Sequence, residues 1–383
     1  MMSAERYAIA ADVVFDGATS RRNSAVVIEG STIAAVMPRG EVSDSIETFE
    51  APRSAWLAPG FIDIQVNGGG DVLFNADPTP EGVAKIVAAH RKFGVTSILP
   101  TLITDTDDTM AVALSAVEIM LDREPGVLGV HLEGPFLSPE KPGVHRRDLI
   151  RRPEPRHERM LTSFTKGALL VTLAPEQIPA GFIARLAAAG ARIALGHSLA
   201  SYAQTRAAMA EGLTGFTHLF NAMPPLSARE PGPVAAALES ANAYYGLIVD
   251  GWHVAPAMLR LALRGAGHAM LVSDAMPPVG GERREFDLQG SPIMVRDGRC
   301  ATTEGVLAGS AIGMATAVGN SVRLLGTPLE QALRLASAEP ADFLGLGHWL
   351  GRLAPGYRAD IVAFDPSDLA VFATWVAGRK FDA

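Results

Sequence analysis

Four acidic and histidine residues each follow a short apolar stretch, and together they have the composition of a divided metal site. These residues, which lie far apart in the sequence, are Glu133, His197, His218 and Asp274. The carboxylate of Glu133 and the imidazoles of His197 and His218 form a suitable ligand set for Zn²⁺ or Fe²⁺, with a coordination position left open for water. Because a metal lowers the pKa of its bound water toward neutrality, this pattern favours a hydrolytic site.

His131 lies two residues before Glu133, and side chains two apart on a strand point to the same face. His131 is therefore either a direct ligand or a structural residue beside the site, and the base rate for single histidines favours the structural role. The histidines outside these motifs are expected to lie on the surface or in the core. They are His90, His157, His268 and His348.

The elements that must position these residues alternate between strands and helices. Apolar runs typical of strands lie near 57–66, 95–100, 127–132, 168–173, 191–196, 214–219, 246–249 and 269–273. Helical stretches separate them, for example at 80–93, 108–121, 179–189, 202–211 and 255–264. Continuous apolar runs are typical of parallel strands buried on both faces. The pattern predicts a (β/α)₈ barrel, whose chemistry sits at the carboxyl ends of the strands, where the four residues fall.

The two ends of the chain lack this alternation of strands and helices. Residues 7–14, 24–28 and 32–36 read as short antiparallel strands, and 359–364 is again strand-like. Residues 309–325 and 328–336 read as helices. We therefore predict a small β-sandwich built from both termini, with its first part at 1–55, the barrel at 56–349 and its second part at 350–383.

Composition limits the possible functions. The net charge of −8 provides no basic field, so no nucleic-acid partner is expected. No apolar run approaches the roughly 18 residues of a membrane span, and the first residues lack the apolar core of a signal peptide. We therefore expect a cytoplasmic protein without a membrane partner. The single cysteine, Cys300, excludes an intrachain disulfide and a thiolate cluster, so histidine, aspartate or glutamate must hold any metal.

Several motifs occur in a specific order along the chain. They are PGFID at 59–63, HLEGPF at 131–136, THLFNAM at 217–223, LAGS at 307–310 and GYRAD at 356–360. In these motifs the sequence resembles the N-acetylglucosamine-6-phosphate deacetylases, which belong to the amidohydrolase superfamily. The resemblance covers nearly the whole chain, and it implies hydrolysis of N-acetylglucosamine 6-phosphate to glucosamine 6-phosphate and acetate.

The resemblance implies a role for each residue of the divided site. Glu133, His197 and His218 would bind one catalytic divalent metal. Zinc is favoured, and iron, cobalt and manganese are the alternatives. Asp274 would be the general base that takes a proton from the metal-bound water and returns it to the leaving amine.

One motif departs from many members of the superfamily, which carry His-x-His after the first strand. This chain has Gln65-Val66-Asn67 there, a form that occurs among the deacetylases. Amides are poorer metal ligands than imidazoles. The fourth predicted barrel strand, at 168–173, also lacks a lysine that could be carboxylated to bridge two metals. We therefore predict one metal per subunit, with a second site near Gln65 and Asn67 weak or absent.

The resemblance also implies the substrate contacts. They are His145, Asn221, Ala222, Arg229, His253 and Leu307. His145 would help to polarise the acetyl carbonyl, and Arg229 would grip the phosphate, for which a guanidinium fork is suited. In the family some phosphate contacts cross a subunit interface, which predicts a homodimer.

Alternatives remain open from the sequence alone. An amidohydrolase acting on N-acetylgalactosamine 6-phosphate or on an N-acyl D-amino acid could use the same metal and base, and a silent relative could keep only the scaffold. Trp252 occupies a usually aliphatic place before His253 and could alter the pocket edge.

The glycines at 68–70 predict a tight turn rather than a phosphate cradle, because no P-loop lysine follows. The arginines at 146, 147, 151 and 152 predict a solvated loop face, and the alternative is that they help to attract the anionic substrate.

Overall fold

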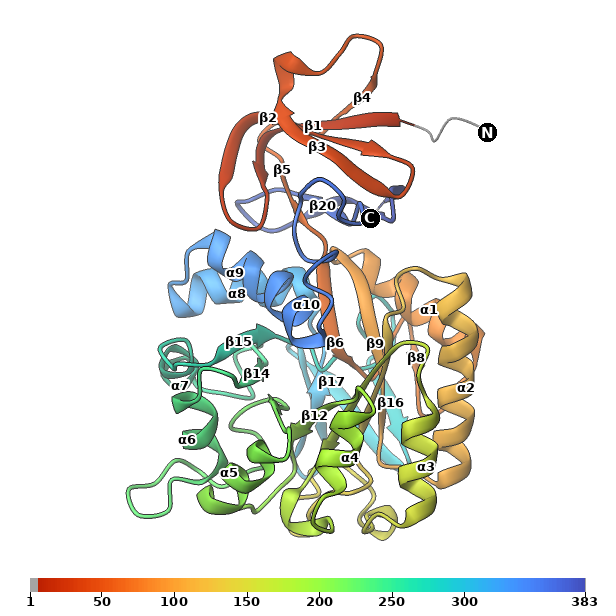
Figure 1. Ribbon diagram of the computed structural model, residues 1–383, viewed down its shortest axis with the longest axis vertical. Coiled ribbons are helices and arrows are strands. Elements are labelled where there is room, and N and C mark those ends of the chain that lie inside the picture. Colours follow the sequence, from red (N-terminus) through yellow and green to blue (C-terminus); the bar gives the residue numbers. More distant parts are fainter. Residues whose placement is uncertain (1–5, 383) are drawn as a thin grey trace. The chain divides into compact units, whose positions relative to one another are not determined.

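The computed structural model describes residues 6–382 of the chain (Figure 1). The chain divides into two compact units. Among the described residues, one holds 6–63, 88–97 and 313–382, and the other holds 64–87 and 98–312. The domain boundaries predicted from the sequence remain a prediction.

The first unit contains a β domain to which both ends of the chain contribute. Its strands are β1 (Arg6–Phe15), β2 (Ser20–Glu29), β3 (Thr32–Pro38), β4 (Glu47–Glu50), β5 (Trp56–Pro59), β20 (Ile361–Phe364), β21 (Val371–Val376) and β22 (Arg379–Asp382). They pair in the order β22-β21-β20-β5-β1-β2-β3, with β4 beside β1. β5 pairs antiparallel with β20, so that Ala58 lies opposite Val362. This pairing confirms the predicted β domain formed from both termini.

One apolar cluster joins these strands. Ile9, Val26 and Leu57 from the first part of the chain pack in it with Ile361 and Trp375 from the last part. Burial of an aliphatic or aromatic side chain of this size contributes about 1.5–3 kcal/mol, so the cluster links the two ends of the chain energetically.

Three helices of the first unit follow the barrel in sequence. They are α8 (Met314–Leu325), α9 (Leu329–Leu335) and α10 (Ala338–Leu344). The prediction of a helix from residue 309 is wrong at its start, because Leu307–Ser310 forms a strand, β19, that pairs with its neighbour β18.

The second unit and the segments entering it carry the parallel sheet. Its order is β15-β14-β13-β12-β11-β10-β9-β6, which has eight strands. They are β6 (Phe61–Val66), β9 (Val95–Ile103), β10 (Gly129–Glu133), β11 (Ala168–Leu173), β12 (Arg192–Leu195), β13 (Gly215–Phe216), β14 (Tyr244–Leu247) and β15 (His268–Leu271). A parallel bridge between Val66 and Ala275 closes the ring. The predicted TIM-like barrel is confirmed, although the run at 57–66 is divided between β5 and β6.

Helices follow the barrel strands (Figure 1). They are α1 (Pro80–Arg91), α2 (Asp107–Arg123), α3 (Pro155–Ser163), α4 (Phe182–Ala188), α5 (Tyr202–Ala210), α6 (Gly232–Glu239) and α7 (Pro256–Ala262). Caps fix their starts. The Ser201 hydroxyl accepts from the backbone N–H of Gln204 in a capping box at α5, and the Thr106 hydroxyl accepts from Thr109 at α2. None of the helices within residues 6–382 is long and apolar enough to cross a membrane.

Two small antiparallel sheets complete the second unit. β16 (Glu285–Leu288), β17 (Ser291–Arg296), β18 (Arg299–Thr302) and β19 form the larger one, and β7 (Gly68–Gly69) pairs with β8 (Val72–Leu73) in the other. The larger sheet has its own apolar cluster, which includes Phe286, Ile293 and Cys300. Its buried thiol has a pKa raised to about 12 by burial, so Cys300 is a packing residue. The β7–β8 hairpin is the tight turn predicted for the glycines.

Candidate metal centre

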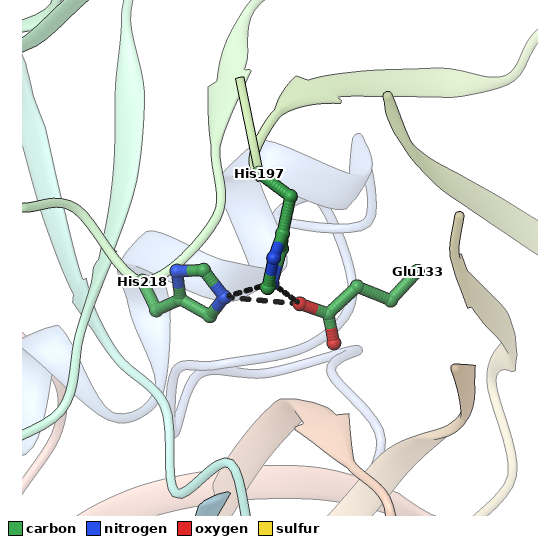
Figure 2. Close-up of side chains that lie close together, drawn as sticks. All are labelled: Glu133, His197 and His218. Carbon is green, nitrogen blue, oxygen red and sulfur yellow. Dashed lines mark hydrogen bonds and ion pairs between the residues drawn. The ribbon is translucent and has the colours of Figure 1, made fainter. Parts of the chain in front are cut away.

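Three side chains from different barrel strands meet at one point. Glu133 is the last residue of β10, and His197 and His218 each follow a strand end, β12 and β13. Glu133 Oε1 lies 3.1 Å from His197 Nε2 and 3.0 Å from His218 Nε2, and the two Nε2 atoms are 3.1 Å apart. Figure 2 shows the two rings and the carboxylate directed at one another. All three residues are buried.

The hydrogen bonds around the cluster show that its donor set fits a cation. Nδ1 of His197 lies 2.9 Å from the carbonyl oxygen of Lys141, so Nδ1 carries a proton, and in the neutral tautomer that binds a metal Nε2 is unprotonated. Nε2 of His197 then presents a lone pair to the carboxylate of Glu133 and to His218. Lone pairs at this separation repel unless a cation lies between them. Two imidazoles and a carboxylate, each offering one atom, match a divalent metal site.

The electrostatics of the cluster lead to the same conclusion. Burial by itself would raise the pKa of Glu133, but its interactions with His197 and His218 outweigh burial and hold that pKa well below the usual range. Burial would lower the pKa of His218, but the Glu133 carboxylate outweighs it and raises that pKa. The cluster therefore holds a fixed negative charge that attracts a cation, either a proton or a metal.

His145 lies beside the cluster and is oriented as a hydrogen-bond donor. Its Nδ1 accepts from the backbone N–H of Thr104 at 3.3 Å and lies 2.8 Å from the Thr104 hydroxyl. Burial first, and then the charge of His197, lower the pKa of His145 to about 3, so its ring is neutral and carries its proton on Nε2. That N–H lies 4.0 Å from Glu133 Oε1, at the edge of the cluster.

Asp274 follows β15 and contacts the amides of the first strand. Its Oδ1 accepts from Asn67 Nδ2 at 2.6 Å and from Gln65 Nε2 at 3.2 Å. Burial, followed by the negative charge of Glu133, raises the pKa of Asp274 to about 6. A carboxyl with a pKa close to the working pH can both accept and return a proton.

Three of the four residues have a strained backbone. His197, His218 and Asp274 have φ values of 48°, 31° and 50°, in the left-handed region that residues with a Cβ seldom adopt. Each such conformation costs on the order of 1–3 kcal/mol and persists only where the surrounding structure enforces it. All three residues also line the cavity described below.

His131 has a structural role. Its Nε2 lies 2.7 Å from the Thr172 hydroxyl, and its Nδ1 lies 3.3 Å from the Thr101 hydroxyl. The Thr172 hydroxyl in turn lies 2.6 Å from the Thr217 hydroxyl. Both ring nitrogens are therefore engaged away from the cluster. This arrangement favours the structural alternative for His131 over direct ligation.

The cluster opens into a cavity of about 360 Å³, a size suited to a small molecule. The predicted site residues that line it are Asn67, Glu133, His145, His197, His218, Asn221, Ala222, His253, Asp274 and Leu307. The loop 140–144 and Met276 also line the cavity, and sequence reasoning missed them. The proximity of this loop to the HLEGPF motif was the available signal. His90, His157, His268 and His348 are not among the lining residues.

His253 is held in place by a residue that sequence reasoning also missed. The carboxylate of Asp250 accepts from His253 Nδ1 at 2.6 Å and from the backbone N–H groups of Trp252 and His253 at 2.8 and 2.9 Å. Burial alone would raise the pKa of Asp250, but these hydrogen bonds outweigh it and lower that pKa. The indole of Trp252 is half exposed, and the Arg299 guanidinium lies 5.9 Å from its ring centroid.

Arg229 is exposed and is not among the residues that line the cavity. Its predicted phosphate contact therefore remains a prediction. Two of the arginines at 146–152 pair with carboxylates outside the cavity: Arg146 with Asp148, and Arg151 with Asp107 at 2.5 Å. The Arg146 pair is exposed, as predicted for a solvated loop face.

The eight-stranded barrel, with a buried carboxylate–histidine cluster at its strand ends, is the arrangement of a metal-binding TIM-barrel hydrolase. Residues 56–381 match the model of the amidohydrolase family. The chain belongs to the amidohydrolase family.

Individual relatives agree with the resemblance found in the motifs. The chain is 34% identical over 379 residues to the N-acetylglucosamine-6-phosphate deacetylase of Haemophilus influenzae, covering 98% of this chain and 99% of that protein. It is 43% identical over 330 residues to the N-acetylgalactosamine-6-phosphate deacetylase of Shewanella sp. (strain ANA-3), covering 85% and 83%. The crystal structure of the N-acetylglucosamine-6-phosphate deacetylase from Pasteurella multocida superimposes with a TM-score of 0.95 at 35% identity, covering 99% and 100%. The predicted resemblance is confirmed.

Proposed function

We propose that this chain hydrolyses the acetamide of N-acetylglucosamine 6-phosphate to glucosamine 6-phosphate and acetate. The observation that carries the proposal is the meeting of Glu133, His197 and His218 with Asp274 in one cavity. The near full-length similarity to the Haemophilus influenzae deacetylase supports the substrate.

The residues have separate tasks in this reaction. Glu133, His197 and His218 hold one divalent metal, which we propose to be zinc, with iron, cobalt or manganese as alternatives. When bound, the metal lowers the pKa of water and polarises the acetyl carbonyl. Asp274 accepts the proton of the attacking water and returns it to the leaving amine. His145 donates its Nε2 hydrogen to the carbonyl oxygen, where negative charge develops.

The phosphate end of the substrate requires further contacts. We propose that His253, Asn221, Ala222 and Leu307 bind the sugar phosphate, since all four line the cavity. Arg229 is exposed, and we propose that it reaches the cavity of a second copy in a homodimer. We propose that the reaction takes place in the cytoplasm, because a phosphorylated sugar made there is retained by the apolar bilayer.

One observation supports an alternative substrate. The relative from Shewanella, at 43% identity, is named for N-acetylgalactosamine 6-phosphate. The two sugars differ at one ring carbon, and the same cluster and base would serve both. We keep the galactosamine epimer as the alternative substrate.

Acetate release from a substrate panel tests the proposal. The metal-loaded protein is given N-acetylglucosamine 6-phosphate, N-acetylgalactosamine 6-phosphate and unphosphorylated N-acetylglucosamine. We expect the highest kcat/KM with the first. A preference for the galactosamine epimer would keep the mechanism and replace the substrate, whereas no acetate from any of the three would refute the proposed function.

A further inference from the structure

The amides of Gln65 and Asn67 converge on one oxygen of Asp274. Asn67 Nδ2 lies 2.6 Å from Oδ1, and Gln65 Nε2 lies 3.2 Å from the same atom. Both amide side chains are buried, at 1% and 2% exposure. We call Gln65 and Asn67 the amide pair. Because both donate to Oδ1, Oδ2 of Asp274 is left as the oxygen that can exchange a proton.

Gln65 also connects Asp274 to the metal cluster. Its Nε2 lies 3.3 Å from Oε2 of Glu133, whereas Oε1 of Glu133 faces the two histidines. An amide NH₂ has two hydrogens and can donate one to each carboxylate. A single side chain therefore sets the separation between the carboxylate of the cluster and the carboxylate of the base.

The orientation of the amide pair does not suit metal ligation. A carboxylate accepts hydrogen bonds, so each amide must turn its nitrogen, and not its oxygen, toward Asp274. Hard metal ions bind an amide through its oxygen. The oxygen of Asn67 is buried without a hydrogen-bond partner among the described residues, so the bond to Asp274 is the polar contact that orients this side chain.

The backbone joins the same two segments. The N–H groups of Asn67 and Gly68 both donate to the carbonyl of Ala275, each at 2.9 Å. A parallel bridge between Val66 and Ala275 continues this contact. The strand end that carries the amide pair is thus fixed to the segment that carries Asp274, which limits movement of the base.

We propose that Gln65 and Asn67 are positioning residues that hold Oδ1 of Asp274 and thereby present Oδ2 to the attacking water. This inference rests on the proposed function and adds a role for the residues that replace His-x-His in this chain. The amide pair acts through Asp274 and orients the proton transfer, and it binds no metal.

Kinetics of amide-pair variants test this role. Gln65→Met and Asn67→Leu keep the side-chain size and remove the donors. We expect kcat to fall by ~10- to 100-fold, the scale expected for a misplaced reacting group, with KM changed by less than ~3-fold. Metal content per chain should equal that of the unsubstituted protein. The exposed Asn242→Ala serves as the control and should keep its kcat.

A double-variant cycle separates positioning from general damage to the fold. In an Asp274→Asn background the base is already absent, so adding Gln65→Met should lower kcat by less than ~3-fold further. The proposal would be overturned if Gln65→Met lowered kcat as much in the Asp274→Asn background as it does alone. It would also be overturned if the single variants lost metal or kept an unchanged kcat. If a variant does not fold, as judged by Tm, Gln65→Ala and Asn67→Ala replace it. The unsubstituted protein is assayed first, because a failure to release acetate there refutes the proposed function instead.

Discussion

At the scale of single residues, the site depends on how each polar side chain is held. Types and spacing in the sequence were enough to predict Glu133, His197, His218 and Asp274, because such residues at barrel strand ends seldom have another purpose. The left-handed backbone at the last three could not be predicted, since it arises from tertiary contacts. The same holds for the bonds from the amide pair to Asp274, which connect residues 207 and 209 positions apart.

Asp274→Asn removes the proposed base while keeping the size of the side chain. We expect kcat to fall by roughly 10²-fold or more, the usual scale for a general base, with metal content unchanged. Steady-state acetate release and elemental analysis measure the two quantities. The exposed Asp297→Asn is the matched control and should behave as the unsubstituted protein. Turnover within a few fold of normal in Asp274→Asn would remove this residue from the mechanism.

Asp250 makes stability depend on pH. Its pKa is lowered in the fold, so its contribution is present above the unfolded pKa of about 3.9 and is lost as pH falls through the folded value. The Tm difference between the unsubstituted protein and Asp250→Asn should therefore be largest above about pH 5 and should shrink below pH 4. Thermal melts from pH 7 to 3 measure it. A Tm difference that does not change with pH would contradict this assignment.

At the scale of elements, the sequence predicted those whose burial is uniform. All eight barrel strands were expected from continuous apolar runs, because strands buried on both faces leave that pattern. The sheet β16–β19 was missed, although β16 alternates exposed and buried residues in the pattern of a half-exposed strand. Helices α3, α6 and α10 are not among the helical stretches named from the sequence. Helix α3 is short, and its nine residues, PRHERMLTS, are mostly polar.

The β7–β8 hairpin gives a prediction at this scale. A Cβ added to Gly68 would lie 2.4 Å from the carbonyl oxygen of Val72 and 2.9 Å from the backbone nitrogen of Pro277. Gly68→Ala should therefore push the hairpin away from the segment that follows Asp274, lowering both Tm and kcat. Gly40→Ala, whose Cβ would meet nothing within 4 Å, is the control. If both variants melt and turn over alike, the close packing at Gly68 has no functional consequence.

At the scale of the whole molecule, the proposal that Arg229 binds the substrate phosphate in the cavity of a second copy can be tested in two steps. Arg229→Ala should raise KM for the phosphorylated substrate by roughly 10-fold or more, as expected for the loss of a charged hydrogen bond. The exposed Arg264→Ala is the control. An unchanged KM in Arg229→Ala would refute the phosphate contact.

Hybrid dimers test whether Arg229 acts across the interface. Mixing Arg229→Ala with Asp274→Asn subunits pairs an intact base in one subunit with an intact arginine in the other. If Arg229 acts in the partner's cavity, the mixture assayed at substrate concentrations below the normal KM should be more active than the average of the two variants measured separately. No gain over that average after confirmed subunit exchange would place the arginine in its own cavity or outside the mechanism.

Metal titration of the stripped protein tests whether Glu133, His197 and His218 hold a single catalytic metal. We expect acetate release from N-acetylglucosamine 6-phosphate to be absent without metal and to rise linearly with added Zn²⁺ to a plateau at one equivalent per chain. Glu133→Gln and His218→Ala should abolish that recovery, because each removes a ligand of the cluster. Full activity in the metal-free protein, or a plateau only at two equivalents, would contradict a single metal held by Glu133, His197 and His218.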